Sequence, residues 1–237
     1  MKRVFLVLAI LYFSQSIKGQ GVLVPGQPGA IAVMDYNKPP MFMRELFRDG
    51  ITPKLYGDIN GTPFLFDNFL LARVKFYDDR VADSVLVKLN VYENKIHFIS
   101  ENLEELQISI AVKEITITDK NPSWNGNVYR MGYSMGGNGI FQVLADGKNV
   151  QVLKKVMIKI WETRSLGDQQ KKNFQYEDEL YLATNNKVYV AGKKCAAFIS
   201  GLDEKYQEKV QKYIITNNIR CNKEEDMRKL ADYCNSL

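Results

Sequence analysis

Short turns between strand-like segments most constrain the fold of this chain. Val85, Val87, Leu89 and Val91 alternate with polar residues, which is the period of a half-buried strand, and further strand-like segments follow up to Gly192. Antiparallel strands can be joined by such turns, whereas parallel strands need long crossovers. The sequence therefore predicts an α+β fold: a mostly antiparallel β-meander of about eight to ten strands, curved into a sheet or half-barrel, with three short C-terminal helices.

Three two-residue turns set the expected hairpin registers, because Asn and Asp-Gly pairs accept positive φ angles. The turns are Glu93-Asn94, Asp146-Gly147 and Asn185-Asn186. They predict the pairs Leu89–Phe98, Asn90–His97, Phe141–Val152, Val143–Val150, Leu182–Tyr189 and Ala183–Val188. Further strands are predicted over residues 70–77, 106–110, 114–118 and 128–133, and the strand after Gly147 is expected to run to about residue 161.

The hydrophobic period changes to that of helices after Gly192. Asp203 is expected to cap one helix, and Asn222 with Glu225 resembles a capping box that opens the last helix. An apolar face on this last helix predicts that it packs on the sheet or on its neighbouring helix. The face consists of Met227, Leu230, Ala231 and Cys234.

The N-terminal region has the layout of a secretory signal peptide. Lys2 and Arg3 precede an apolar run over residues 4–13, and small residues follow up to Gly19. We therefore expect residues 1–19 to be a signal peptide, 20–60 a Gly/Pro-rich leader with a short helix at 41–47, 61–192 the antiparallel β domain, and 193–237 a helical segment packed on it. The alternative is an uncleaved N-terminal anchor.

Export would leave a soluble periplasmic or extracellular chain with little excess charge. The first cysteine is Cys195, so a lipoprotein is not expected, and we expect no transmembrane segment in the mature chain. The formal net charge of +5 includes Lys2, Arg3 and Lys18, which precede the expected cleavage site. The basic pairs at 154–155, 171–172 and 193–194 are scattered, so we expect no nucleic acid partner.

One motif is typical of a catalytic nucleophile. Gly132, Ser134 and Gly136 match the G-x-S-x-G elbow of α/β-hydrolases, but the chain's only histidine, His97, precedes the serine instead of following it. Glycines after Ser134 also disfavour the helix that an elbow requires. We therefore expect a loop and predict no catalytic residue, although a Ser–Lys or Ser–carboxylate arrangement stays open.

Other constellations are weaker. Acidic groups at Asp78-Asp79, Glu104-Glu105 and 177–179 could supply the carboxylates of a glycosidase only at a suitable separation, and turns or solvated strands explain them. His97 is expected on the polar face of a strand and not at a metal. No phosphate loop, dinucleotide fingerprint or EF-hand occurs, so the sequence predicts no metal site, no cofactor-binding residue and no cofactor.

The three cysteines leave at least one thiol unpaired. Cys195 and Cys234 are expected as buried thiols on helix faces. Cys221 and Cys234 bracket a helix and would lie roughly 18–20 Å apart, too far for a disulfide. Pairing of Cys195 with either of the others stays open.

The region from Gly61 onward resembles an uncharacterised family of exported proteins from Bacteroidota. The shared features are Gly61-x-Pro63-x-Leu65, residues 85–98 with Lys88-Leu89-Asn90-Val91-Tyr92, Phe141-Gln142-Val143-Leu144-x-x-Gly147-Lys148, Leu153-Lys154-Lys155 and Asp232-Tyr233-x-Asn235-Ser236-Leu237. This resemblance implies export but no established activity and no site residues.

Together these patterns predict an exported, non-catalytic cell-envelope or secreted protein. It would bind a protein partner or an apolar, lipid-like ligand in the envelope. Two alternatives are a secreted hydrolase that uses Ser134 or a carboxylate pair, and a purely structural envelope protein. A polar cleft with titratable groups would favour the enzyme, and an apolar cavity or patch would favour the binding protein.

Overall fold

The computed structural model describes residues 56, 58–134, 139–163, 171–192 and 195–237. All of them belong to one compact unit that spans Met34–Leu237. The predicted signal peptide, the leader up to residue 55 and its short helix lie outside the described residues. Within the described residues, no helix is both long and apolar enough to cross a membrane.

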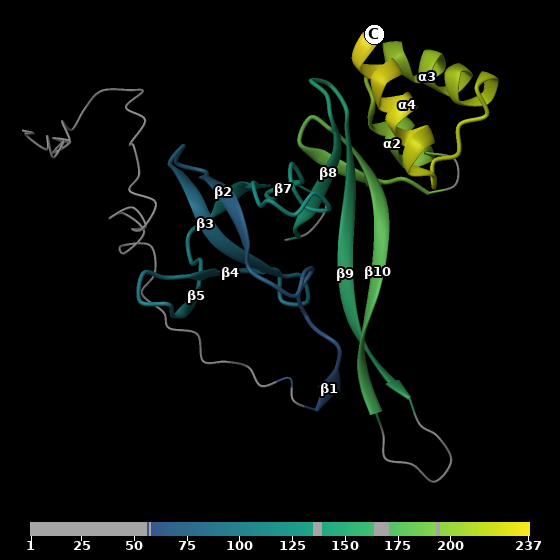
Figure 1. Ribbon diagram of the computed structural model, residues 1–237. Helices are drawn as coiled ribbons and strands as arrows, with labels where there is room; N and C mark the ends of the chain where they lie inside the picture. Colours follow the sequence, from purple (N-terminus) through teal and green to yellow (C-terminus); the bar gives the residue numbers. More distant parts are fainter. Residues whose placement is uncertain (1–55, 57, 135–138, 164–170, 193–194) are drawn as a thin grey trace, which may run out of the picture. The chain divides into compact units, whose positions relative to one another are not determined.

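Eleven strands in the described residues form one open sheet, and three helices follow it (Figure 1). The strands are β1 (Ile59–Asn60), β2 (Leu70–Phe76), β3 (Val81–Asn90), β4 (Lys95–Ile99), β5 (Glu105–Gln107), β6 (Val112–Ile117), β7 (Val128–Arg130), β8 (Phe141–Asp146), β9 (Gln151–Thr163), β10 (Lys171–Thr184) and β11 (Lys187–Val190). The helices are α2 (Ala196–Gly201), α3 (Glu204–Thr216) and α4 (Glu224–Ser236).

The sheet is largely antiparallel, as predicted, but it is mixed, and its strand order departs from a meander. The strand order is β1-β10-β9-β8-β7-β6-β2-β3-β4-β5, and β11 pairs with β10. β6 returns beside β2, and β1 lies parallel to β10, with Ile59 opposite Lys172 and Asn60 opposite Asn173. All other pairs are antiparallel. The predicted boundary near Gly61 therefore follows the first strand of the sheet.

The observed register of the hairpin at Asn185-Asn186 is the one that the sequence predicts. Leu182 lies opposite Tyr189 and Ala183 opposite Val188. Asn185 and Asn186 both have positive φ, at 50° and 60°, as a type I′ turn requires. This turn is local, so its two residues suffice to define it.

The predicted registers of the other two hairpins are wrong. In the first, Leu89 pairs with Ile96 and Lys88 with His97, because the turn occupies residues 91–94 and the Asn90 side chain accepts a hydrogen bond from the Glu93 amide at 3.0 Å. The strand faces are kept, since the shift adds two residues to the turn.

In the second hairpin, a distant side chain rearranges the turn. Asp146 pairs with Gln151, and a register irregularity falls between Val143 and Ala145. The Asn235 Oδ1 atom accepts hydrogen bonds from the amides of Asn149 and Val150 at 2.8 and 2.9 Å. The loop therefore takes four residues and closes around α4.

Two apolar clusters cover opposite faces of β9 and β10, so these strands are covered on both sides. Val152 and Leu182 pack beneath the helices in one cluster. Leu153 and Tyr181 lie in a second cluster on the other face. A third and larger cluster fills the part of the sheet built from β2, β3, β4 and β6.

The helices follow the predicted pattern except at their caps. Met227, Leu230, Ala231 and Cys234 are buried on α4, as predicted. Asp203 holds the N-cap position of α3, but its side chain makes no capping hydrogen bond. The predicted capping box is wrong, because Lys223 is the N-cap of α4; the Asp226 carboxylate instead accepts bonds from the Arg220 amide and Nε at 3.1 and 3.0 Å.

Candidate functional site

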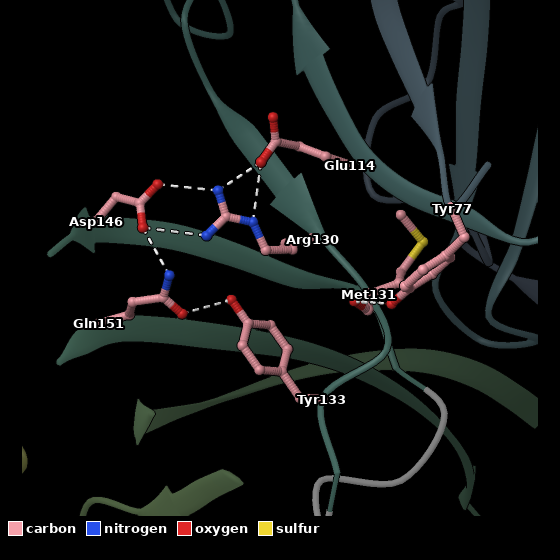
Figure 2. Close-up of polar contacts among 7 residues, drawn as sticks. All are labelled: Tyr77, Glu114, Arg130, Met131, Tyr133, Asp146 and Gln151. Carbon is pink, nitrogen blue, oxygen red and sulfur yellow. Dashed lines mark hydrogen bonds and ion pairs between the residues drawn. The ribbon is translucent and has the colours of Figure 1, made fainter. Parts of the chain in front are cut away.

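A polar network centred on Arg130 joins four neighbouring strands (Figure 2). Arg130 ends β7, which is only three residues long, and Glu114 lies directly opposite it on β6. Asp146 ends β8 and pairs with Gln151 at the start of β9. Cross-strand neighbours lie within side-chain reach, so the ladder itself brings these polar groups together.

The guanidinium of Arg130 binds both carboxylates. Its Nε donates to Glu114 Oε2 at 2.9 Å, and its Nη1 and Nη2 donate to the two oxygens of Asp146 at 3.1 and 2.9 Å. Gln151 Nε2 donates to Asp146 at 2.7 Å, and the Tyr133 hydroxyl donates to Gln151 Oε1 at 2.9 Å. Every member of this chain of hydrogen bonds has a partner.

Asp146 and Arg130 keep their charges near neutral pH. Hydrogen bonding to Arg130 lowers the pKa of Asp146, and the bond to Asp146 raises the pKa of Arg130. Burial raises the pKa of the Tyr133 hydroxyl, which stays protonated. A general acid or base needs a pKa near the working pH, so this arrangement is suited to holding strands together and not to proton transfer.

The residues before the serine motif are fixed by Tyr77. Its hydroxyl donates to the Met131 carbonyl at 2.9 Å (Figure 2). Gly132 has φ of +81°, and a Cβ there would lie 1.5 Å from the Tyr77 hydroxyl oxygen. Only glycine fits, so this part of the G-x-S-x-G string has a structural cause.

Ser134 lies against the β10–β11 turn. Its hydroxyl donates to the Asn186 carbonyl at 2.8 Å, and its amide donates to the same carbonyl at 3.0 Å. His97 lies on β4, and its Nδ1 is 2.6 Å from Glu105 Oε1, so it is not the base of Ser134. A serine hydroxyl that donates to a carbonyl has no base to activate it.

The sequence predicts His97 on the polar face of a strand, and the structure places it on β4. Its side chain is buried, and its ring packs edge-on against Phe64 at a centroid separation of 5.2 Å. In the described residues, no group of three or more His, Cys, Asp and Glu side chains could hold a metal ion.

Three of the acidic residues singled out in the sequence, Asp78, Glu177 and Glu179, are held in local contacts. Asp78 accepts from Arg80 Nε at 2.8 Å, which lowers the pKa of Asp78. Glu177 pairs with Lys159 at 2.5 Å, and Glu179 accepts from the Tyr181 hydroxyl at 2.6 Å. The structure does not bring these carboxylates together into one site.

The cysteines form one disulfide. Cys195 pairs with Cys221 at a Cα–Cα distance of 5.5 Å, one of the pairings that the sequence left open. The expectation of a buried thiol is therefore wrong for Cys195, which precedes α2 instead of lying on its face. Cys234 is the buried free thiol, and burial raises its pKa to about 12.

An open hollow of about 440 Å³ lies where β10 and β11 meet the segment before α4. Leu180, Val190 and Ala191 are its apolar lining residues, and Asp178, Glu179 and Lys223 line it with charged side chains. Lys154 and Glu224 also line it and form an ion pair at 3.8 Å.

Sequence reasoning missed both the Arg130 network and this hollow. The opposite charges of Glu114 and Arg130 on two predicted strands were a signal for the network, but only a known register would have placed them opposite each other.

No protein-family model matches this chain, and no significant match was found among curated proteins or solved structures.

Proposed function

We propose that this chain is an exported, non-catalytic protein of the cell envelope or the secreted fraction, which binds a protein partner or an apolar, lipid-like ligand. The observation that carries the proposal is the hollow beside β10, about 440 Å³ in volume, with Leu180, Val190 and Ala191 in its walls. Ligand sites are concave and of this size, with apolar walls and a few polar groups; here Lys154, Asp178, Glu179, Lys223 and Glu224 add charged groups to the lining.

The state of the reactive groups supports binding over catalysis. The Ser134 hydroxyl donates a hydrogen bond to the Asn186 carbonyl, and Arg130 binds Glu114 and Asp146 at the same time. A hydrolase that used Ser134 or these carboxylates would need the group beside a substrate site and free to exchange a proton.

Export is supported by the disulfide and by the sequence of the N-terminal region. Disulfides form and persist in oxidising compartments, so the Cys195–Cys221 bond is compatible with a periplasmic or extracellular location. A cleaved signal peptide over residues 1–19 and membership of the Bacteroidota family of exported proteins belong to this same proposal.

Filling the hollow tests the proposal. Val190 is 45 % exposed on β11 and contributes to the hollow, whereas Val81 on β3 is similarly exposed at 38 % and does not. Affinity capture from envelope extracts should retain a protein or a lipid. Val190→Trp should lose it and Val81→Trp should retain it, because only the first side chain occupies the hollow.

Two further measurements separate the binding protein from an enzyme and from a cytoplasmic chain. A fluorophosphonate probe should not label the folded protein, and intact-mass analysis of the exported product should show cleavage near residues 16–19. Labelling that disappears in Ser134→Ala, or turnover in a hydrolase panel that one polar substitution removes, would make the protein an enzyme.

A further inference from the structure

β10 has a partner strand along one whole edge but only at the two ends of the other. β9 pairs with it from Lys171 to Ala183. On the other edge, β1 pairs with Lys172 and Asn173, and β11 pairs with residues 181–184. Gly61, the residue after β1, lies beside Phe174, because a Cβ on Gly61 would be 3.5 Å from the Phe174 Cβ. Residues 175–179 have no partner strand on this edge within the described chain.

The backbone direction follows from a hydrogen bond at the end of this interval. The Ala191 amide donates to the Leu180 carbonyl at 2.8 Å, so Leu180 turns its backbone polar groups away from β9. These groups alternate in direction along an antiparallel strand. The amide and carbonyl groups of Tyr176 and Asp178 therefore also face outward, whereas those of Glu177 face β9.

This edge leads directly into the hollow. Asp178, Glu179 and Leu180 line it from the strand, and Val190 and Ala191 line it from the end of β11 and beyond. A segment that pairs with residues 175–179 would have its next residues at the apolar walls. Strand addition gains affinity from main-chain hydrogen bonds and specificity from side-chain pockets.

The charge of the edge selects the partner. Residues 177–179 are three consecutive carboxylates, and in the described structure Asp178 is exposed and forms no ion pair. Like charges on facing strands are unfavourable, so two copies of this edge would repel each other. A segment with lysine or arginine would meet the opposite charge.

We propose that the outer edge of β10 over residues 175–179 receives an extended, basic segment of a partner protein, which adds a strand to the sheet and places an apolar side chain in the hollow. The inference rests on the proposed binding function and names the partner chemistry for it. Acidic residues also protect sheet edges from adventitious pairing, and protection alone is the competing outcome.

Proline scanning of the edge provides matched variants. Asp178→Pro removes an amide that faces outward and keeps the ladder to β9, so the protein should fold and melt close to the unaltered chain. Glu177→Pro removes an amide that faces β9 and should lower the melting temperature. Asp178→Asn keeps the backbone and removes only the charge.

The probe is a displayed library of random heptapeptides, selected against the full-length protein with its disulfide intact. Enriched peptides should carry Lys or Arg and slow hydrogen exchange at the amides of Tyr176 and Asp178. Affinity should fall about tenfold with Asp178→Pro or with alternate N-methylation of the peptide, and about threefold with Asp178→Asn.

Three results would overturn the proposal. A library that yields no peptide protecting these amides would leave edge protection as the role of the carboxylates. If enriched peptides bind Asp178→Pro with unchanged affinity, the protein binds peptides elsewhere and the proposed function stands without this site. A dimer in sedimentation that Asp178→Pro dissociates would make the occupant a second copy.

Discussion

Removing the Cys195–Cys221 disulfide should destabilise the protein by about 3.5 kcal/mol. The bond joins residues 26 positions apart, and the loop-closure entropy of a cross-link of that span gives this value at 25 °C. The closed loop contains α2 and α3, and both half-cystines belong to the cluster beneath the helices. The cost therefore falls first on the helical segment.

The measurement is urea unfolding of the double variant Cys195→Ala/Cys221→Ala, followed by circular dichroism for the helices and by tryptophan fluorescence for the sheet. Trp124 and Trp161 both lie in the sheet region, so fluorescence reports on the sheet and not on the helices. For a domain of this size, the melting temperature should fall by about 7–14 °C.

Reduction of the unaltered protein is the matched control and should reproduce the loss. Replacing Cys234 alone should leave the disulfide contribution in place, because that thiol is free. If the double variant unfolds at the same urea concentration as the unaltered protein, the covalent link does not hold the helical segment and the reasoning is refuted.

Three other substitutions test the interior. Tyr129→Phe should leave the free energy of unfolding unchanged or raise it, because the Tyr129 hydroxyl is buried without a hydrogen-bond partner in the described structure. A loss of more than about 1 kcal/mol in urea unfolding would contradict this reasoning, because it would show that the hydroxyl forms a stabilising hydrogen bond. Gly132→Ala should destabilise the protein by at least about 2 kcal/mol, because the new Cβ would collide with the Tyr77 hydroxyl oxygen and the φ angle of Gly132 is positive. In a Tyr77→Ala background, Gly132→Ala should cost less stability. Simple additivity in this double-mutant cycle would contradict the collision. The pKa of Asp146 is lowered by Arg130, so its contribution to stability is present above the unfolded pKa of about 3.9 and is lost as the pH falls through the folded value. Arg130→Met should therefore reduce the acid dependence of unfolding below about pH 4 as well as overall stability, and an unchanged pH profile would remove the proposed role of the ion pairs.

Local patterns predicted the elements better than they predicted the pairing between them. The turn preference of Asn185 and Asn186 predicted the register of their hairpin, and the apolar stripe of α4 predicted the buried residues of that helix. The Asp146-Gly147 hairpin failed because Asn235, 86 positions beyond Asn149, binds the loop from α4. A local propensity was overridden by a tertiary contact that the sequence did not reveal.

The candidate sites were less predictable for the same reason. Arg130 meets Glu114 only because β6 and β7 pair in one register. The open edge of β10 exists because β1, which is two residues long, pairs with a strand more than a hundred positions away. Neither short strands nor parallel pairing leaves a periodic signal in the sequence.

The bond between Asn235 and the β8–β9 loop also has a consequence for how the chain folds. Both loop amides and the carbonyl of Val150 depend on a side chain that is synthesised 85 and 86 positions later. Contacts between residues so far apart in sequence close late and slow the folding of β-rich domains. An emerging chain would therefore have an incomplete β8–β9 loop until α4 has been synthesised, and final closure of the sheet would wait until the last helix has docked.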